Sequence, residues 1–256
     1  MRRVFFLFIL AAFLFTGCSA FTEKEPGEPD AKQLYDLGKA ALDKEDYEIA
    51  IEHFEKLESR YPFRDYAQQA KLNIAYAYYK SNEPESAIST ADRFIKTYPR
   101  HPNVDYAYYL RGLASFTPER NFFDKLFRLD PAHRDPRSAQ KSFQYFSELV
   151  ERFPDSKYAA DAVQRMIHLQ NYLARHELNV AAYYMKRGAY VAAVNRAEYV
   201  IENYPRSSST VNALDMMAKA YKKLGLDDLA NDVLRVLILN HPDHPPQTKA
   251  TDHLDG

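Results

Sequence analysis

Apolar and polar positions along the chain alternate with the period of an α-helix, in pairs of segments that a short polar break separates. In "QLYDLGKAALDKEDYEIAIEHFEKLESRYP", the apolar positions before the break "DKED" are Leu34, Leu37, Gly38 and Ala41. The apolar positions after the break are Ala50, Phe54 and Leu57. Both sets follow the i, i+3, i+4, i+7 spacing of one helix face, so the stretch predicts two amphipathic helices joined by a turn.

An aromatic residue followed by proline closes this stretch, and the same closure recurs. The recurring prolines are Pro62, Pro99, Pro154, Pro205 and Pro242, which lie 37, 55, 51 and 37 residues apart. Proline cannot continue the helical hydrogen-bond ladder, and it disfavours helical backbone in the residue before it. Each closure is therefore predicted to end the second helix of a pair. The two longer intervals exceed 37 by 18 and 14 residues, which indicates two insertions.

Fixed-period self-similarity is typical of solenoids in which each unit contacts only its neighbours. The units resemble tetratricopeptide repeats, so we expect an all-α fold, an α-solenoid of about five helix pairs in a right-handed superhelix. The expected units are residues 31–64, 68–101, 105–156 (with an insertion at 117–135), 158–207 and 211–242, before a polar tail at 243–256. Residues 156–187 contain no glycine or proline and are compatible with one helix of roughly 30 residues, about 45 Å long.

The first residues, "MRRVFFLFILAAFLFTGCSAF", read as a secretory signal rather than a membrane span. Two arginines precede an apolar run that is too short to cross a bilayer. The end, "LFTGC", resembles a bacterial lipobox, so we expect a signal peptide at 1–17 and lipid (palmitate) attachment at Cys18. Residues 18–30 would form a flexible tether. Because Ser19 and not Asp follows Cys18, the expected location is the periplasmic face of the outer membrane.

Composition removes several classes of function. Lys and Arg number 34 against 35 Asp and Glu, so no global charge favours nucleic acid. Only seven glycines disfavour phosphate-binding loops and nucleophile elbows. The histidine pair in "HPDH" (His241, His244) lies in a proline-rich stretch and has no further ligand pattern. We therefore expect no catalytic residue, no cofactor and no metal, and a protein that is not an enzyme.

Twenty tyrosines suggest a surface for binding instead. By resemblance to tetratricopeptide units, positions of each first helix face the concave side of the solenoid. In the fifth unit they are polar and rich in lysine: Asn212, Asp215, Lys219, Lys222 and Lys223. In the first three units they are apolar and aromatic, and they predict a groove for an extended peptide. The candidates are Tyr35, Leu72, Tyr76, Tyr79, Tyr106, Tyr109 and Phe116. Alternatively, these side chains only extend the core between helices.

The insertion at 117–135 clusters four apolar residues, which predict a short amphipathic helix capping this groove. They are Phe122, Phe123, Leu126 and Phe127.

Five stretches together resemble the BamD family (YfiO/ComL) of outer-membrane assembly lipoproteins: "RYPFRDYAQQ", "IAYAYYK", "HPNVDYAYYLRGL", "RDPRSAQKSFQYFSELVERFPDSKYA" and "YYMKRGAYVAAVNR". The resemblance implies a non-enzymatic protein that docks on the POTRA domains of BamA through its C-terminal repeats, with Arg196 as the contact residue. It implies that the N-terminal repeats receive unfolded outer-membrane proteins and the lipoprotein BamC, and it suggests BamE-like lipoproteins as further partners. The residues that the resemblance places in this N-terminal binding region are Tyr61, Phe63, Tyr66, Tyr76 and Tyr79.

Two other classes of protein share this scaffold. A tetratricopeptide lipoprotein could organise cell-wall or division proteins, in which case its partners would be associated with peptidoglycan. The superhelical arm of a lytic transglycosylase would need a further catalytic domain, and only 14 residues follow Pro242.

Overall fold

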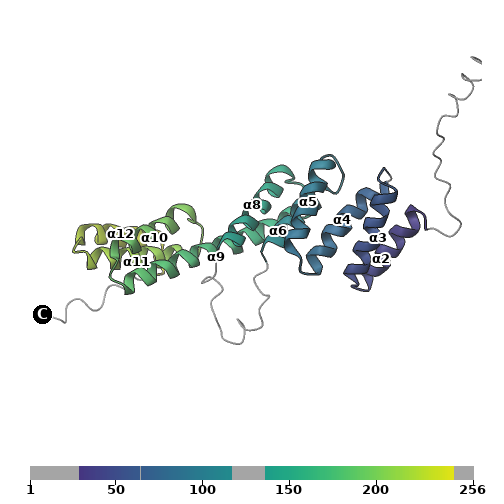
Figure 1. The fold of residues 1–256 in the computed structure, drawn as a ribbon. Helices are drawn as coiled ribbons and strands as arrows, with labels where there is room; N and C mark the ends of the chain where they lie inside the picture. Colours follow the sequence, from purple (N-terminus) through teal and green to yellow (C-terminus); the bar gives the residue numbers. More distant parts are fainter. Residues whose placement is uncertain (1–28, 64, 117–135, 245–256) are drawn as a thin grey trace, which may run out of the picture.

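The computed structural model describes residues 29–63, 65–116 and 136–244. Across these ranges the chain forms ten α-helices and no strand (Figure 1). The helices are α2 (Ala31–Asp43), α3 (Tyr47–Arg60), α4 (Asp65–Lys80), α5 (Pro84–Thr97), α6 (Val104–Ser115), α8 (Arg137–Arg152), α9 (Ala159–Lys186), α10 (Tyr190–Asn203), α11 (Thr210–Lys223) and α12 (Asp227–Asn240).

The helices stack as an elongated array in which sequence order is spatial order (Figure 1). Each helix packs against the next one along the described chain, and first helices of successive pairs also touch, as α2 with α4, α4 with α6, and α9 with α11. Contacts therefore stay between neighbouring units, as a solenoid requires. The expected all-α solenoid of five helix pairs is confirmed.

The core repeats in register with the closing prolines. Five residues before each proline, the second helix buries Leu57, Phe94, Leu149, Val200 and Leu237, none more than 1% exposed. Twelve residues before each proline lies a small side chain, at most 1% exposed, namely Ala50, Ala87, Ser142, Ala193 and Ala230. The same proline thus fixes both the end of the second helix and the register of its buried face.

The aromatic residue before each proline caps its helix, as predicted. In α3, Tyr61 leaves helical geometry at φ −131°, and its N–H still donates to the Leu57 carbonyl at 2.9 Å. The equivalent residues at the ends of α5, α8, α10 and α12 are Tyr98, Phe153, Tyr204 and His241, with φ between −128° and −137°. These φ angles lie in the range that a residue before proline prefers.

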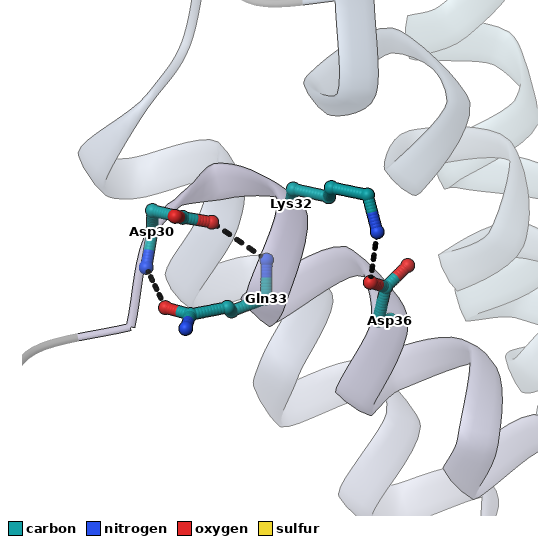
Figure 2. Close-up of polar contacts among 4 residues, drawn as sticks. All are labelled: Asp30, Lys32, Gln33 and Asp36. Carbon is teal, nitrogen blue, oxygen red and sulfur yellow. Dashed lines mark hydrogen bonds and ion pairs between the residues drawn. The ribbon is translucent and has the colours of Figure 1, made fainter.

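The first helix begins with a reciprocal capping box (Figure 2). The Asp30 carboxylate accepts from the Gln33 N–H at 2.8 Å, and the Gln33 side chain accepts from the Asp30 N–H at 2.8 Å. One turn on, the Lys32 ammonium pairs with Asp36 at 2.6 Å. Both N–H groups would otherwise lack helical partners, so the box stabilises the N-terminal end of α2.

Helix α9 is one continuous helix of 28 residues, twice the 14 of α11. The 14 surplus residues of the fourth interval therefore lengthen a helix by about 21 Å instead of forming a loop. The first half of α9 contributes Ala162, Leu169 and Leu173 to a core cluster shared with α4–α8. Its second half contributes Ala174 and Leu178 to a cluster shared with α10 and α11. Helix α9 therefore belongs to both parts of the solenoid.

Candidate peptide-binding surface

Five tyrosines of α4, α6 and the start of α9 form one cluster, which we call the aromatic cluster: Tyr76, Tyr79, Tyr106, Tyr109 and Tyr158. The Tyr106 ring packs on Tyr158 with centroids 5.2 Å apart. Burial, and then the neighbouring hydroxyls of Tyr158, Tyr76, Tyr109 and Tyr79, raise the pKa of Tyr106. All five rings pack on the core of the third unit while remaining partly exposed. They therefore serve both the core and the surface, so the two interpretations of these side chains do not exclude each other.

The edge of the aromatic cluster toward α9 is held in place by polar contacts. The Tyr109 ring stacks on Tyr158 with centroids 4.8 Å apart and an interplanar angle of 18°. Its hydroxyl donates to the Asp161 carboxylate at 2.5 Å, and Arg165 Nε donates to the same oxygen at 2.5 Å. Burial and the hydrogen bond to Asp161 raise the pKa of Tyr109 to about 12. The phenol therefore remains a neutral donor near pH 7.

Tyr158, Asp161 and Arg165 were not among the residues that the sequence singled out. A signal for Tyr158 existed, because Tyr66-Ala67 and Tyr158-Ala159 both begin four residues after a closing proline. Both alanines are buried, so in both places the tyrosine precedes a buried residue at the start of a first helix. The Asp161–Arg165 pair is an ordinary i, i+4 pair on a helix, and its contact with Tyr109 depends on how α9 packs against α6.

A second group of predicted residues lies at the N-terminal end of the array. The rings of Tyr35 and Tyr66 are 5.3 Å apart, and Tyr35 also packs on Phe54 at 5.8 Å. Tyr61 is partly buried, and its hydroxyl lies 3.4 Å from the Pro29 carbonyl. Phe63 stands apart from any cluster, with 98% of its side chain exposed.

Two of the predicted surface residues differ from the rest. Leu72 is 0% exposed and lies in the core that α4 shares with α6, so the expectation that it lines the groove is wrong. It is buried because α4 packs against α2, α5 and α6 at once. Phe116 ends α6 and packs edge-on against Tyr172 of α9 at 5.1 Å. It therefore belongs to the junction between α6 and α9.

Arg196 projects from α10 toward α9. Its guanidinium donates to Glu177 at 2.9 Å, with the arginine side chain 45% exposed and the glutamate 12% exposed. The pair links α10 to α9, and about half of the arginine side chain remains exposed at the surface. Cys18, the apolar insertion at 117–135 and the tail after 244 lie outside the described residues.

Within the described ranges, no group of His, Cys, Asp or Glu is arranged to hold a metal ion. No helix in those ranges combines the length and the apolar character that a membrane crossing requires.

The chain resembles named proteins along most of its length. Residues 28–236 match the family described as YfiO, outer membrane lipoprotein. The outer membrane protein assembly factor BamD of Neisseria meningitidis serogroup B is 46% identical over 214 residues, which cover 84% of this chain and 80% of that protein. The BamD proteins of Xylella fastidiosa and Vibrio cholerae are 40% and 37% identical, covering 93% and 91% of this chain and 82% and 96% of theirs.

Among solved structures, the TPR2AB domain of yeast Sti1 in complex with pHSP90 is similar, with a TM-score of 0.45 and 17% identity. That similarity covers 84% of this chain and 78% of the Sti1 chain. The sequence relatives are far closer, and they agree with the stretches singled out above. The chain therefore belongs to the YfiO family of outer membrane lipoproteins, together with the BamD assembly factors.

Proposed function

We propose that this protein is a non-enzymatic scaffold for the assembly of outer-membrane proteins. The observation that supports this most directly is the aromatic cluster, which presents five partly exposed tyrosine rings on a rigid helical frame. Tyrosine offers a large apolar face with a hydroxyl for hydrogen bonding, which suits recognition of an extended chain. Since similar proteins are named outer membrane protein assembly factors, we infer that such a chain would be an unfolded outer-membrane protein.

The aromatic cluster would hold terminal strands of these clients in extended form. Such strands alternate aromatic and polar side chains, so every second residue can contact the tyrosine rings. Tyr35, Tyr61, Phe63 and Tyr66 extend the surface toward the N-terminal end and would contact the same chain or a lipoprotein such as BamC. Phe116 would contribute through its position beside α9.

The C-terminal repeats would bind the POTRA domains of BamA, with Arg196 as the contact. A half-exposed guanidinium that is already oriented by Glu177 loses little freedom on binding a carboxylate. Acylation of Cys18 would anchor the protein to the periplasmic face of the outer membrane, since buried acyl chains contribute about 0.8 kcal/mol per CH₂. Docking would then raise the concentration of a held client near the insertion machinery. BamE-like lipoproteins would be further partners, and no nucleic acid is involved.

The test is photo-crosslinking in cells from positions 196 and 109, in separate strains, followed by mass spectrometry. We expect a large barrel protein with periplasmic repeats from position 196 and unfolded outer-membrane proteins from position 109. Position 78 is the matched control, because the Tyr78 hydroxyl donates to Glu55 of α3 at 3.5 Å. The Tyr78 ring packs on two other core clusters, one of the first unit and one that contains Ala87 and Ile88.

Crosslinks only to wall-associated or division proteins, from a chain shown to be folded and lipidated, would contradict this proposal. They would favour the alternative of a tetratricopeptide lipoprotein that organises those proteins.

A further inference from the structure

A second concave surface lies between α9 and α11, in the C-terminal part of the solenoid. A cleft of about 760 Å³ opens between one stripe of each helix. The polar residues lining it are Asn171, Arg175, Asn179 and Lys186 on α9, Asn212, Asp215 and Lys219 on α11, and Ser208 and Ser209 just before α11. The α11 residues are the concave positions that the repeat pattern predicts for the fifth unit. Neither the aromatic cluster nor Arg196 belongs to this cleft.

The lining favours an anionic ligand. It includes three cations, Arg175, Lys186 and Lys219, and one carboxylate, Asp215, which gives a formal net charge of +2. The carboxylate is already neutralised, since Asp215 pairs with Lys219 at 2.6 Å and is 8% exposed. Leu178, Met185 and Met216 supply apolar surface beside these charges. A ligand with acidic and apolar side chains would match both features.

The shape and the amide groups of the cleft suit a polypeptide. Asn171 and Lys186 lie 15 positions apart on α9, which corresponds to about 22 Å along the helix. An extended chain rises about 3.3 Å per residue, so about seven residues would span this length. Side-chain amides offer both a donor and an acceptor, as the edge of a peptide backbone does. The Asn171 oxygen is already occupied, because it accepts from Ser207 Oγ at 2.8 Å and from the Ser208 N–H at 2.9 Å, so this amide is held in place and offers a peptide its NH₂ group.

We propose that this cleft is a second peptide site, which binds an acidic, extended segment of a partner protein about seven residues long. It is separate from the surface that contains Arg196. The partner of Arg196 on α9 is Glu177, two positions from both Arg175 and Asn179, so it points about 200° around the helix from them. Both surfaces can therefore be occupied together. The inference goes beyond the proposed function and does not depend on which proteins dock at Arg196.

The test is fluorescence anisotropy on the full chain with three labelled, end-blocked heptapeptides, in which leucine alternates with glutamate, glutamine or lysine. The glutamate peptide should bind roughly tenfold more tightly than the glutamine peptide, and the lysine peptide most weakly. A Lys186→Gln/Lys219→Gln variant should bind the glutamate peptide about tenfold more weakly and the glutamine peptide with unchanged affinity. The control is Lys39→Gln/Lys80→Gln, which removes two charges from the N-terminal half.

Equal affinity for the glutamate and lysine peptides, or an unchanged glutamate affinity in the Lys186→Gln/Lys219→Gln variant, would overturn the inference. A photoreactive glutamate peptide locates the site directly, and it should crosslink to α9 and α11. Crosslinks confined to the aromatic cluster would also overturn the second site, yet they would leave the proposed function of that cluster intact. The two ideas therefore fail in distinguishable ways.

Discussion

Glycine and phenylalanine set how closely the two helices of a pair approach. A Cβ atom added at Gly38 or Gly112 would lie closer than 3.0 Å to the ring of Phe54 or Phe146, respectively. Phe54 is 0% exposed and Phe146 is 2% exposed, so neither ring has solvent into which it can move. In each of these two pairs, glycine in the first helix therefore leaves the space that an aromatic ring of the second helix fills.

The close approach of Gly112 and the Phe146 ring gives a prediction for Gly112→Ala. The added methyl group should push the Phe146 ring against its neighbours and lower the free energy of unfolding by about 1–3 kcal/mol. Urea denaturation followed by circular dichroism measures the change. Phe146→Leu provides the control, because the smaller side chain leaves room for the methyl group. The double variant should then lose less unfolding free energy than the two single variants lose together. Strictly additive losses would show that the Phe146 ring does not obstruct the added methyl group.

The sequence predicted which residues lie on apolar helix faces better than it predicted which of those residues are buried. Spacing placed Gly38 and Leu72 on apolar stripes, but it cannot tell a stripe that faces a neighbouring helix from one that faces the concave surface. For Leu72 the neighbour is α6, so the residue is buried. The Tyr109–Asp161 bond joins residues 52 apart and depends on the packing of α6 against α9, which no local pattern specifies.

Neighbouring units are tied together by a recurring bond from a first helix to the next turn. Gln69 of α4 accepts from Asn103 at 3.2 Å, Asp105 of α6 accepts from Ser156 at 2.6 Å, and Asn171 of α9 accepts from Ser207 at 2.8 Å. The separations are 34, 51 and 36 residues, and the longest of them spans the insertion at 117–135. The identities of the partners change, but each bond connects the turn after a second helix to the preceding first helix.

Asn171→Ala tests this bond at the level of the element. Loss of its oxygen leaves the Ser207 hydroxyl and the Ser208 N–H without that acceptor, so we expect about 1–2 kcal/mol of destabilisation. Amide hydrogen exchange should show the loss of protection concentrated in the turn between α10 and α11. Asn212→Ala is the matched control, since Asn212 is exposed on the other wall of the same cleft. Equal exchange in both variants would mean that the bond does not order the turn.

The molecule as a whole is two stacks joined by α9. The absence of glycine and proline from 156–187 is compatible with one long helix or with a broken one, and the structure has one continuous helix over Ala159–Lys186. The sequence did not reveal that the two halves of α9 bury different faces, because that depends on which helices flank each half. In the described chain, the α2–α8 stack and the α10–α12 helices meet extensively only through α9, with the Tyr204 ring as an additional contact.

Arg175→Pro therefore tests whether α9 couples the two stacks. Arg175 is exposed and follows the point where α9 changes from one core cluster to the other. Proline there removes one helical hydrogen bond and clashes with the preceding turn, at a cost of about 3 kcal/mol or more. Since coupling in a repeat array acts between neighbours, the variant should unfold in two urea transitions where the native chain shows one. Arg175→Ala, which keeps the helix, should retain the single transition. A single transition for Arg175→Pro as well, merely shifted to lower urea, would mean that contacts such as that of Tyr204 suffice to couple the stacks without an intact α9.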